Sequence, residues 1–271
     1  QTSERLKEKY PEITFNKTEK GNVKLDDDVL DDLGKKYSEA ALLSKYQLLN
    51  KRLGQISEGK EAWLKHCQRY GDGRIHGSVL TNSCVSGRCS HRNPNIANVP
   101  RVGVPYGAEC RALFHAPHGW RQIGCDASGL ELRALGAQMY YFDGGEYARL
   151  VSKEDFDIHT HNAKLFGIYD GQGKIEKQTR ELAKRLIYSV LYGGGPFRVG
   201  SILDPSLSER KQKEIGYETI DTFYKNFPAI KKLKDKVDEK VTQRGYLIGI
   251  DGRHLQIRSR HSALNQLLQS T

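Results

Sequence analysis

The segment from Arg180 to Tyr192 restricts the fold more than any other part of the chain, because it predicts one amphipathic helix with well-marked ends. Thr179 is a suitable N-cap residue, and Gly193-Gly194-Gly195-Pro196 stops the helix, since glycine and proline terminate helices. The apolar residues of the segment share one face, which predicts burial against a core. They are Leu182, Ala183, Leu186, Ile187, Val190 and Leu191.

A second face of the same helix carries Arg180, Lys184, Tyr188 and Tyr192 at every fourth position. Each step rises about 6 Å and turns about 40° beyond a full turn, so the four residues form a slowly winding stripe. Arg and Lys bind phosphate, and aromatic rings stack on nucleobases. Two cations followed by two rings therefore match a nucleoside triphosphate, although ordinary solvated helices also carry such patterns.

The overall charge favours a polyanionic partner. The 271 residues contain 43 Lys and Arg against 33 Asp and Glu, a net charge of +10. Nucleic acid is the partner class that this charge suits best. The sequence has no apolar run long enough to cross a bilayer and no signal-peptide profile, so we expect a cytoplasmic protein without membrane contact. An odd number of cysteines, five, argues for a reducing compartment.

Two of the cysteines, Cys84 and Cys89, lie close in sequence to His91 and suggest a zinc site. The spacing lacks the paired Cys-x-x-Cys units of structural zinc sites, and no fourth ligand is evident. We therefore interpret both residues as plain thiols, with zinc as the alternative.

The pattern of the remaining chain predicts both helices and strands. Residues 71–105 are rich in Gly, Asn, Ser and Pro, which indicates loops around one short strand near 75–80. A lysine-rich amphipathic stretch covers residues 208–241, and Asp251-Gly252 is a typical hairpin turn. The remaining chain is therefore expected to combine helices with short strands.

One strand and one helix are predicted around Asp126. Residues 122–125 predict a short strand that leads into this aspartate. The following residues predict a helix with Leu130, Leu135 and Met139 facing inward. Asp126 is therefore expected where a strand ends and a helix begins.

Several motifs resemble those of family A DNA polymerases, most closely the replicative polymerases of T-odd phages. DASGLELR, which begins at Asp126, resembles motif A, and the R-x3-K-x3-Y-x3-Y-G helix resembles motif B. SGRCSHRNPNIANVP, DIHT and SALNQLLQS are similar to further family motifs. Ordered motifs with matching separations are more specific than any one of them. The resemblance implies viral replication in a bacterial host.

The resemblance implies a right-hand polymerase fold of class α+β, with a palm, helical fingers and a truncated thumb. It assigns residues 1–70 to a partial thumb, 71–140 to the palm with motif A, 141–260 to the fingers with the motif B helix, and 261–271 to the start of a helix returning to the palm. The palm sheet would be incomplete, with an edge open to a partner.

The resemblance also implies template-directed DNA synthesis with two Mg²⁺ ions. Asp126 would bind both ions, with the Ala127 carbonyl as a further ligand. His159, Arg180 and Lys184 would hold the phosphates of the dNTP, and Lys184 would also protonate the leaving group. Without DIHT, a core or capping histidine would be the preferred interpretation of His159.

Other roles implied by the resemblance concern the sugar, the bases and the DNA. Glu131 would stand against C2′ of the sugar and exclude ribonucleotides, the alternative being an ordinary first-turn glutamate. Tyr188 would stack on the incoming base, and Tyr192 would pack near the templating base. Contacts to the minor groove of the primer-template, where all correct pairs share acceptors, are expected from Arg88, Asn95, Asn98, Asn265 and Gln269.

The family takes its second catalytic carboxylate from a His-Asp or His-Asp-Glu hairpin, and neither sequence occurs in these 271 residues. We therefore expect the chain to be a fragment, inactive alone, with a C-terminal polymerase fragment as a partner. The alternative is a non-catalytic half of a split polymerase that binds template-primer and dNTP. A third interpretation is a single-subunit RNA polymerase, because such enzymes have a similar arrangement of motifs. Glu131 argues against this interpretation.

Overall fold

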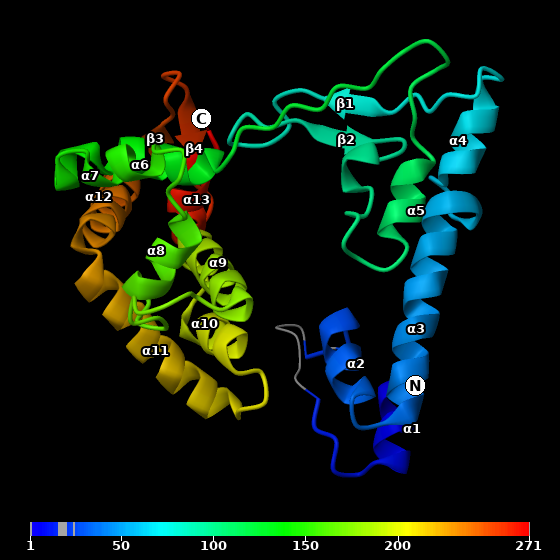
Figure 1. The fold of residues 1–271 in the computed structure, drawn as a ribbon, viewed down its shortest axis with the longest axis horizontal. Helices are drawn as coiled ribbons and strands as arrows, with labels where there is room; N and C mark the ends of the chain where they lie inside the picture. The colour runs from blue at the N-terminus through cyan, green and yellow to red at the C-terminus, as the bar shows by residue number, and fades with distance from the viewer. Residues whose placement is uncertain (1, 16–20, 24, 271) are drawn as a thin grey trace. The chain divides into compact units, whose positions relative to one another are not determined.

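The computed structural model describes residues 2–15, 21–23 and 25–270. Its internal contacts divide the chain into two compact units, whose elements are labelled in Figure 1. Unit 1 comprises residues 1–80 and 91–122, and unit 2 comprises residues 81–90 and 123–271. The chain therefore passes from one unit to the other three times, after residues 80, 90 and 122.

Unit 1 is mostly helical. Its elements are α1 (Thr2–Lys9), α2 (Asp27–Gly34), α3 (Ser38–Leu53), η1 (Gly54–Glu58), α4 (Trp63–Arg69), β1 (Ser78–Leu80), β2 (Ser90–Arg92), η2 (Ile96–Asn98) and α5 (Gly107–Ala112). Strands β1 and β2 pair into a two-stranded sheet, which confirms the strand predicted near 75–80. Glu39 of α3 binds both Lys9 and Tyr10, so these contacts fasten the end of α1 to α3.

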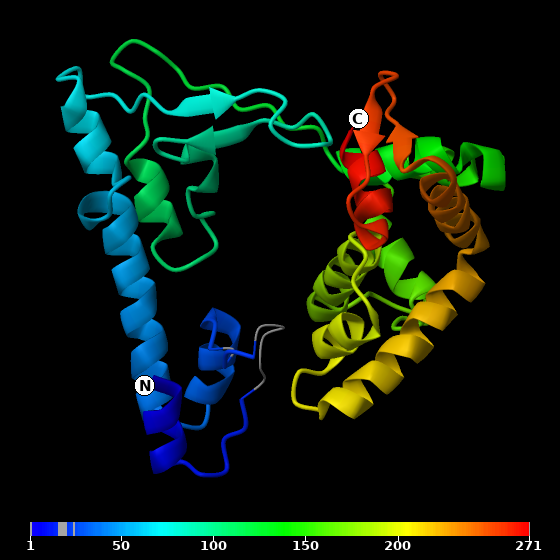
Figure 2. The same cartoon turned by 180° about the vertical axis from the view of Figure 1, so that it is seen from behind.

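Unit 2 contains the larger core. Its elements are α6 (Leu130–Asp143), α7 (Glu146–Val151), α8 (Ile158–Leu165), α9 (Lys177–Leu191), α10 (Pro196–Leu203), α11 (Glu209–Asn226), α12 (Pro228–Arg244), β3 (Tyr246–Ile248), β4 (His254–Gln256), η3 (Arg260–Ser262) and α13 (Ala263–Gln269). Figure 2 shows α13 beside the β3–β4 hairpin. None of the described helices is both long and apolar enough to span a membrane.

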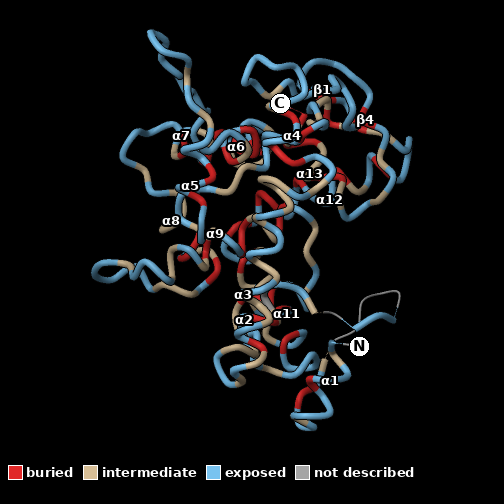
Figure 3. The backbone as a smooth tube through the Cα atoms, turned by 90° about the vertical axis from the view of Figure 1, so that its right-hand side faces the viewer, coloured by how far each residue is buried: buried red, intermediate tan, exposed pale blue. Residues whose placement is uncertain are grey.

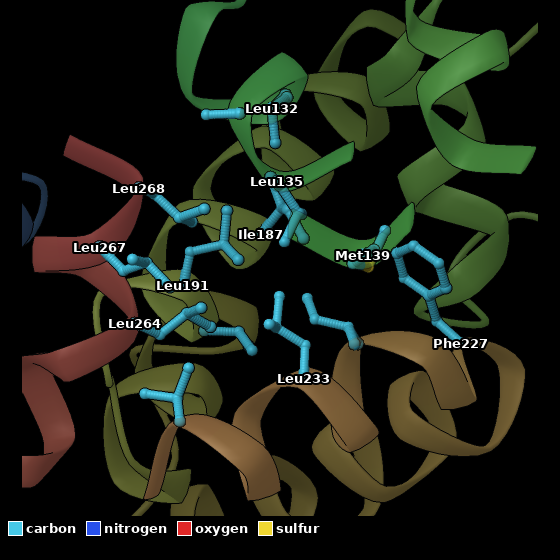
Figure 4. Close-up of a cluster of buried hydrophobic side chains, with 14 of the residues drawn as sticks. Leu132, Leu135, Met139, Ile187, Leu191, Phe227, Leu233, Leu264, Leu267 and Leu268 are labelled. Carbon is cyan, nitrogen blue, oxygen red and sulfur yellow. The ribbon is translucent and has the colours of Figure 1, made fainter. Parts of the chain in front are cut away.

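Apolar side chains from α6, α9, α12 and α13 converge in the core of unit 2 (Figure 4). Leu135 and Met139 of α6 and Ile187 and Leu191 of α9 are completely buried. Burial of one such side chain contributes about 1.5–3 kcal/mol. The buried positions, red in Figure 3, follow the helices, so the core fixes α9 and leaves its second face for other contacts.

Helix α9 confirms the predicted helix, with one correction at its start. The helix begins at Lys177, and Glu176 rather than Thr179 is the N-cap residue. The Arg180 amide donates to the Glu176 carbonyl at 3.0 Å, which extends the helix by most of a turn. Gly193 has φ +79°, a left-handed conformation that favours glycine, and the helix stops there as predicted.

The predicted strand at residues 122–125 is wrong. The stretch is irregular and exposed, and Ile123 is 91% exposed. A strand needs a hydrogen-bonded neighbour, and the two sheets found in the described part of the chain do not include these residues. Leu130, at the first position of α6, is 43% exposed rather than buried, whereas Leu135 and Met139 face inward as predicted.

The predicted hairpin around Asp251-Gly252 is confirmed. Strands β3 and β4 are antiparallel, with Leu247 opposite Leu255, and both leucines are buried in the core. Gly252 has φ +82° in the turn. The lysine-rich stretch at 208–241 divides into α11 and α12 at Pro228, because proline lacks the amide hydrogen that a helix interior needs.

Helices α10 and α11 touch through their backbones at two glycines. A Cβ atom on Gly216 would lie 1.9 Å from the Pro196 carbonyl oxygen, and one on Gly200 would lie 1.7 Å from the Gln212 carbonyl oxygen. Buried Gln212 also donates to the Asp204 and Pro205 carbonyls at 3.1 and 3.2 Å. The two helices therefore form a rigid pair with no room for a side chain between them.

We expect Gly216→Ala to lower the free energy of unfolding by about 1–3 kcal/mol, because overpacking forces the helices apart. Denaturant unfolding measures this change. Gly54→Ala is the matched control, since no atom lies within 4 Å of a Cβ there, and alanine favours the helix by up to about 1 kcal/mol. Equal stability of Gly216→Ala and the wild type would contradict the close approach of α10 and α11.

Candidate functional site

Helix α9 presents the predicted stripe away from the core. Arg180, Lys184 and Tyr188 are half-buried, and Tyr192, directly after the helix, is 41% exposed. The apolar face of the helix is buried, with Leu186 completely inaccessible. Tyr192 lies twelve positions after Arg180, so the stripe is about 18 Å long at the helical rise per residue. The predicted separation of an apolar face from a cationic and aromatic face is confirmed.

The cationic end of the stripe is attached to helix α8 through Asp157. This residue is the N-cap of α8, and its carboxylate accepts bonds from the His159 amide at 3.1 Å and the Thr160 hydroxyl at 2.7 Å. The same carboxylate accepts from Arg180 Nε at 2.8 Å. Asp157 thus holds the DIHT segment, residues 157–160, against α9. The sequence motifs predict no role for Asp157, although an aspartate directly before a helix is a typical N-cap signal.

The pKa values of Asp157 and His159, at the cationic end, are both lowered, but for different reasons. Burial raises the pKa of Asp157, but hydrogen bonds from Arg180, Thr160 and the His159 amide outweigh it and hold the pKa at about 2. Burial lowers the pKa of His159, and the charges of Arg180 and Lys184 lower it further. His159 is therefore neutral at pH 7. Its Nδ1 is buried without a hydrogen-bond partner among the described residues.

We expect Asp157→Asn to change the pH dependence of stability. The pKa of Asp157 is lowered by folding, so the carboxylate stabilises the fold above pH about 4 and loses this effect as the pH falls towards 2. Asn still caps the helix but carries no charge. Because Asp157 and Arg180 are each 39% exposed, the pair contributes only about 0.5–1 kcal/mol.

Denaturant unfolding at pH 5 and at pH 2.5 measures this effect. The stability difference between wild type and Asp157→Asn should be larger at pH 5, and Arg180→Met should reproduce it by removing the partner. Parallel pH profiles for the wild type and both variants would contradict the ion pair.

The aromatic end of the stripe surrounds the carboxylate of Glu131. Arg88 donates to one oxygen at 3.1 Å, and the Tyr192 hydroxyl donates to the other at 2.6 Å. The Glu131 side chain is only 14% exposed. The rings of Tyr188 and Tyr192 lie 5.7 Å apart. Burial raises the pKa of both tyrosines; the Glu131 charge raises the pKa of Tyr188 further, and the hydrogen bond to Glu131 raises the pKa of Tyr192 further. Residues that are distant in sequence thus meet at this end.

Helix α13 completes the aromatic end. A Cβ on Gly193 would lie 1.9 Å from the His261 carbonyl oxygen, so only glycine allows the turn after α9 to approach the start of α13. The Gln269 side chain reaches the Tyr192 hydroxyl. Asn265 is half-buried, and its Oδ1 has no hydrogen-bond partner among the described residues. Gln269 therefore joins the group around Glu131, and Asn265 lies one turn earlier on the same helix.

Asp126 and Ala127 lie in the exposed stretch before α6, five and four residues ahead of Glu131. The described residues contain no cluster of three or more His, Cys, Asp or Glu side chains that could hold a metal. One carboxylate and one carbonyl oxygen suit Mg²⁺, which binds through one or two carboxylates, substrate phosphates and water. The donor atoms thus fit part of a magnesium site.

Asn95 and Asn98 belong to unit 1. Asn95 is the N-cap of η2, where its side chain accepts from the Ala97 amide at 3.1 Å. Both asparagines are exposed and line a cavity of about 310 Å³ together with Lys51 and Gln55. Polar and cationic groups from α3, η1 and the start and end of η2 therefore share one surface of unit 1.

The sequence profile described as DNA polymerase family A matches residues 1–271. The chain belongs to DNA polymerase family A. Among its relatives, the DNA-directed DNA polymerases of Enterobacteria phage T3 and Escherichia phage T7 are each 39% identical over 93% of this chain. DNA polymerase I of Chloroflexus aurantiacus is 29% identical over 88% of this chain. The chain spans 37% of the length of each phage polymerase and 24% of the Chloroflexus enzyme.

A solved structure shows the same fold. The POL domain of Pol1 from M. smegmatis, in complex with DNA primer-template and dNTP, matches with a TM-score of 0.69 at 19% sequence identity. The match covers 98% of this chain and 47% of that chain. Family membership and the α+β polymerase fold class with its short, incomplete sheets are thereby confirmed. The thumb, palm and finger boundaries and the roles of single residues stay predictions.

Proposed function

We propose that this chain is the part of a family A DNA polymerase that binds the incoming dNTP and the primer terminus during template-directed synthesis. The observation that carries the proposal is the α9 stripe, which has Asp157-bound Arg180 at one end and Glu131-bound Tyr192 at the other. Cations at one end and rings at the other suit one triphosphate with its base.

At the cationic end, Arg180 and Lys184 would bind the phosphates as charged donors. Neutral His159 would add a hydrogen bond without adding charge, because its pKa is lowered by burial and by the two cations. Arg180 is held by Asp157 before any nucleotide binds, which reduces the side-chain entropy lost on binding. Lys184 would also donate a proton to the leaving pyrophosphate.

At the aromatic end, Tyr188 would stack on the incoming base and Tyr192 would pack near the templating base. Arg88, Asn265 and Gln269 in unit 2, and Asn95 and Asn98 in unit 1, would contact the minor groove of the primer-template. Donors and acceptors at these positions would test the geometry of a base pair, because correct pairs share minor-groove acceptors.

Asp126 and the Ala127 carbonyl would hold Mg²⁺. When bound, two such ions supply activation of the primer 3′-hydroxyl and charge neutralisation at the triphosphate. Asp126 is exposed, so its carboxylate is open to an ion and to the phosphates beside it. The second carboxylate would have to come from outside these 271 residues, because they contain no His-Asp sequence.

Glu131 would exclude ribonucleotides, because Arg88 and Tyr192 fix its carboxylate in one place. We expect Glu131→Ala to reduce the preference for a complementary dNTP over the matching rNTP by about tenfold or more, since removing one close contact is worth about 1.4 kcal/mol. Nucleotide titration of the chain bound to primer-template with Mg²⁺ measures this preference.

Glu146→Ala is the control, because Glu146 is also a first-turn glutamate in the same unit but is exposed, whereas the Glu131 side chain is 14% exposed. This variant should keep the wild-type preference. An unchanged preference in Glu131→Ala would contradict the steric role of Glu131 and favour an ordinary first-turn glutamate.

A further inference from the structure

The loop that carries Arg88 is a closed turn. The Gly87 amide donates to the Cys84 carbonyl at 2.9 Å, and the Cys84 amide donates to the Arg88 carbonyl at 3.3 Å. Inside the turn, Val85 packs against the hydrophobic core of unit 2, and Ser86 is buried. The turn is therefore attached to unit 2 through Val85, and Arg88 follows directly after Gly87.

A second element, the β3–β4 hairpin, contacts the same turn at Gly87. A Cβ atom on Gly87 would lie 1.9 Å from Nη1, 2.7 Å from Cζ and 3.3 Å from Nη2 of Arg253. Carbon atoms in contact lie about 3.5–4.0 Å apart, so the Arg253 guanidinium already occupies the space that a side chain would need. Gly87 also has φ +82°, a conformation that favours glycine. The guanidinium therefore lies directly on the backbone of the turn.

The guanidinium of Arg253 is oriented by the hairpin. Asp251 accepts hydrogen bonds from Arg253 Nε at 2.5 Å and from the Arg253 amide at 3.1 Å. The Gly249 amide donates to the Arg253 carbonyl at 2.9 Å, and Leu255 of β4 is buried in the core. Asp251 thus holds the Nε side of the guanidinium, while Cζ and the terminal nitrogens contact Gly87.

The position of this turn decides whether Arg88 reaches Glu131. Arg88 Nη2 donates to Glu131 Oε1 at 3.1 Å, and the Arg88 side chain is 51% exposed. Water therefore competes for the Arg88 guanidinium, and the bond needs a backbone that keeps Arg88 within reach. A shift of Arg88 by about 1 Å away from Glu131 would lengthen the bond beyond hydrogen-bonding range. A contact that fixes Gly87 therefore also helps to fix the Glu131 carboxylate.

We propose that Arg253 is a positioning residue for nucleotide selection. By occupying the space at Gly87, its guanidinium holds the turn in the position from which Arg88 binds Glu131. This role rests on the proposed function of Glu131 as the residue that excludes ribonucleotides. The support of the turn by Arg253 does not depend on that function.

Hydrogen exchange of the Gly87 and Cys84 amides, followed by NMR, tests the support of the turn without any nucleotide. Arg253→Ala should speed their exchange by about fivefold, because the turn loses one of its contacts and opens more often. Arg258→Ala is the matched control, since Arg258 is another exposed arginine close to β4, and it should leave both rates unchanged. Equal exchange rates in Arg253→Ala and the wild type would overturn the proposal.

The preference for a dNTP over the matching rNTP tests the positioning role. In nucleotide titration of the chain bound to primer-template with Mg²⁺, Arg253→Ala should reduce this preference by about threefold. The loss should be smaller than in Glu131→Ala, because Tyr192 still binds Glu131. Arg258→Ala should keep the wild-type preference. Equal losses of affinity for dNTP and rNTP in Arg253→Ala would mean a general structural effect and would overturn the positioning role.

Arg88→Ala, alone and combined with Arg253→Ala, shows whether Arg253 acts through Arg88. The double variant should have the same preference as Arg88→Ala, because the support has no further effect once the Arg88 side chain is removed. A further loss in the double variant would overturn the proposal. If Glu131→Ala leaves the preference unchanged, the proposed function of Glu131 is wrong and the selection role of Arg253 is wrong with it. The hydrogen-exchange result still decides whether Arg253 supports the turn.

Discussion

Asp126→Asn is expected to reduce Mg²⁺-dependent nucleotide transfer by at least about 1,000-fold. A carboxylate that holds catalytic metal ions supports several kcal/mol of transition-state stabilisation, and each 1.36 kcal/mol is a factor of ten in rate. The effect should be on catalysis rather than folding, because Asp126 is exposed and lies outside the core of unit 2. Single-turnover primer extension, with the second carboxylate supplied by an added polymerase segment, measures the rate.

Asp155→Asn is the matched control for this experiment, since Asp155 is also an exposed aspartate in an irregular segment of unit 2. This variant should keep the wild-type rate. Primer-template binding by Asp126→Asn should stay within about twofold of wild type, because the change removes no cationic contact to the DNA backbone. A transfer rate of Asp126→Asn within tenfold of the wild-type rate would contradict the proposal that Asp126 binds the metal ions.

Lys184→Ala is expected to weaken dNTP binding and slow transfer, together lowering kcat/KM by about 100-fold. A charged hydrogen bond to a phosphate contributes about 1.5–3 kcal/mol, and loss of a proton donor adds to this. The helix itself should persist, since Lys184 lies on the stripe and Ala is a strong helix former. The dependence of single-turnover rate on dNTP concentration separates the two effects.

Arg185→Ala serves as the control on the same helix, because Arg185 is the neighbouring cation and is exposed. This variant loses the same charge but should change kcat/KM by less than about threefold, as expected for a surface charge away from the phosphates. Similar losses in both variants would mean that α9 attracts the nucleotide only by overall charge.

The sequence pattern predicted α9 well because the features that define it are local. Apolar spacing shows which face is buried, and the glycines after Tyr192 mark the end. The hairpin at Asp251-Gly252 was predictable for the same reason, since its turn residues are adjacent in sequence.

The contacts that build the site were not predictable, because they join residues distant in the chain. Glu131 binds Arg88 across 43 positions and Tyr192 across 61, and Asp157 binds Arg180 across 23. Periodicity contains no information on such pairs. Likewise, residues 122–125 predicted a strand, but a strand depends on a partner that the local sequence does not identify.

Primer extension and primer-template binding, measured on the same purified chain with Mg²⁺ and dNTPs, test the central claim most directly. The proposed function predicts that the chain binds primer-template alone and extends the primer only after addition of a segment carrying the family's His-Asp-Glu hairpin. Failure to bind primer-template would contradict the nucleotide and primer site described around α9. Extension by the chain alone would contradict the need for a carboxylate from outside these residues.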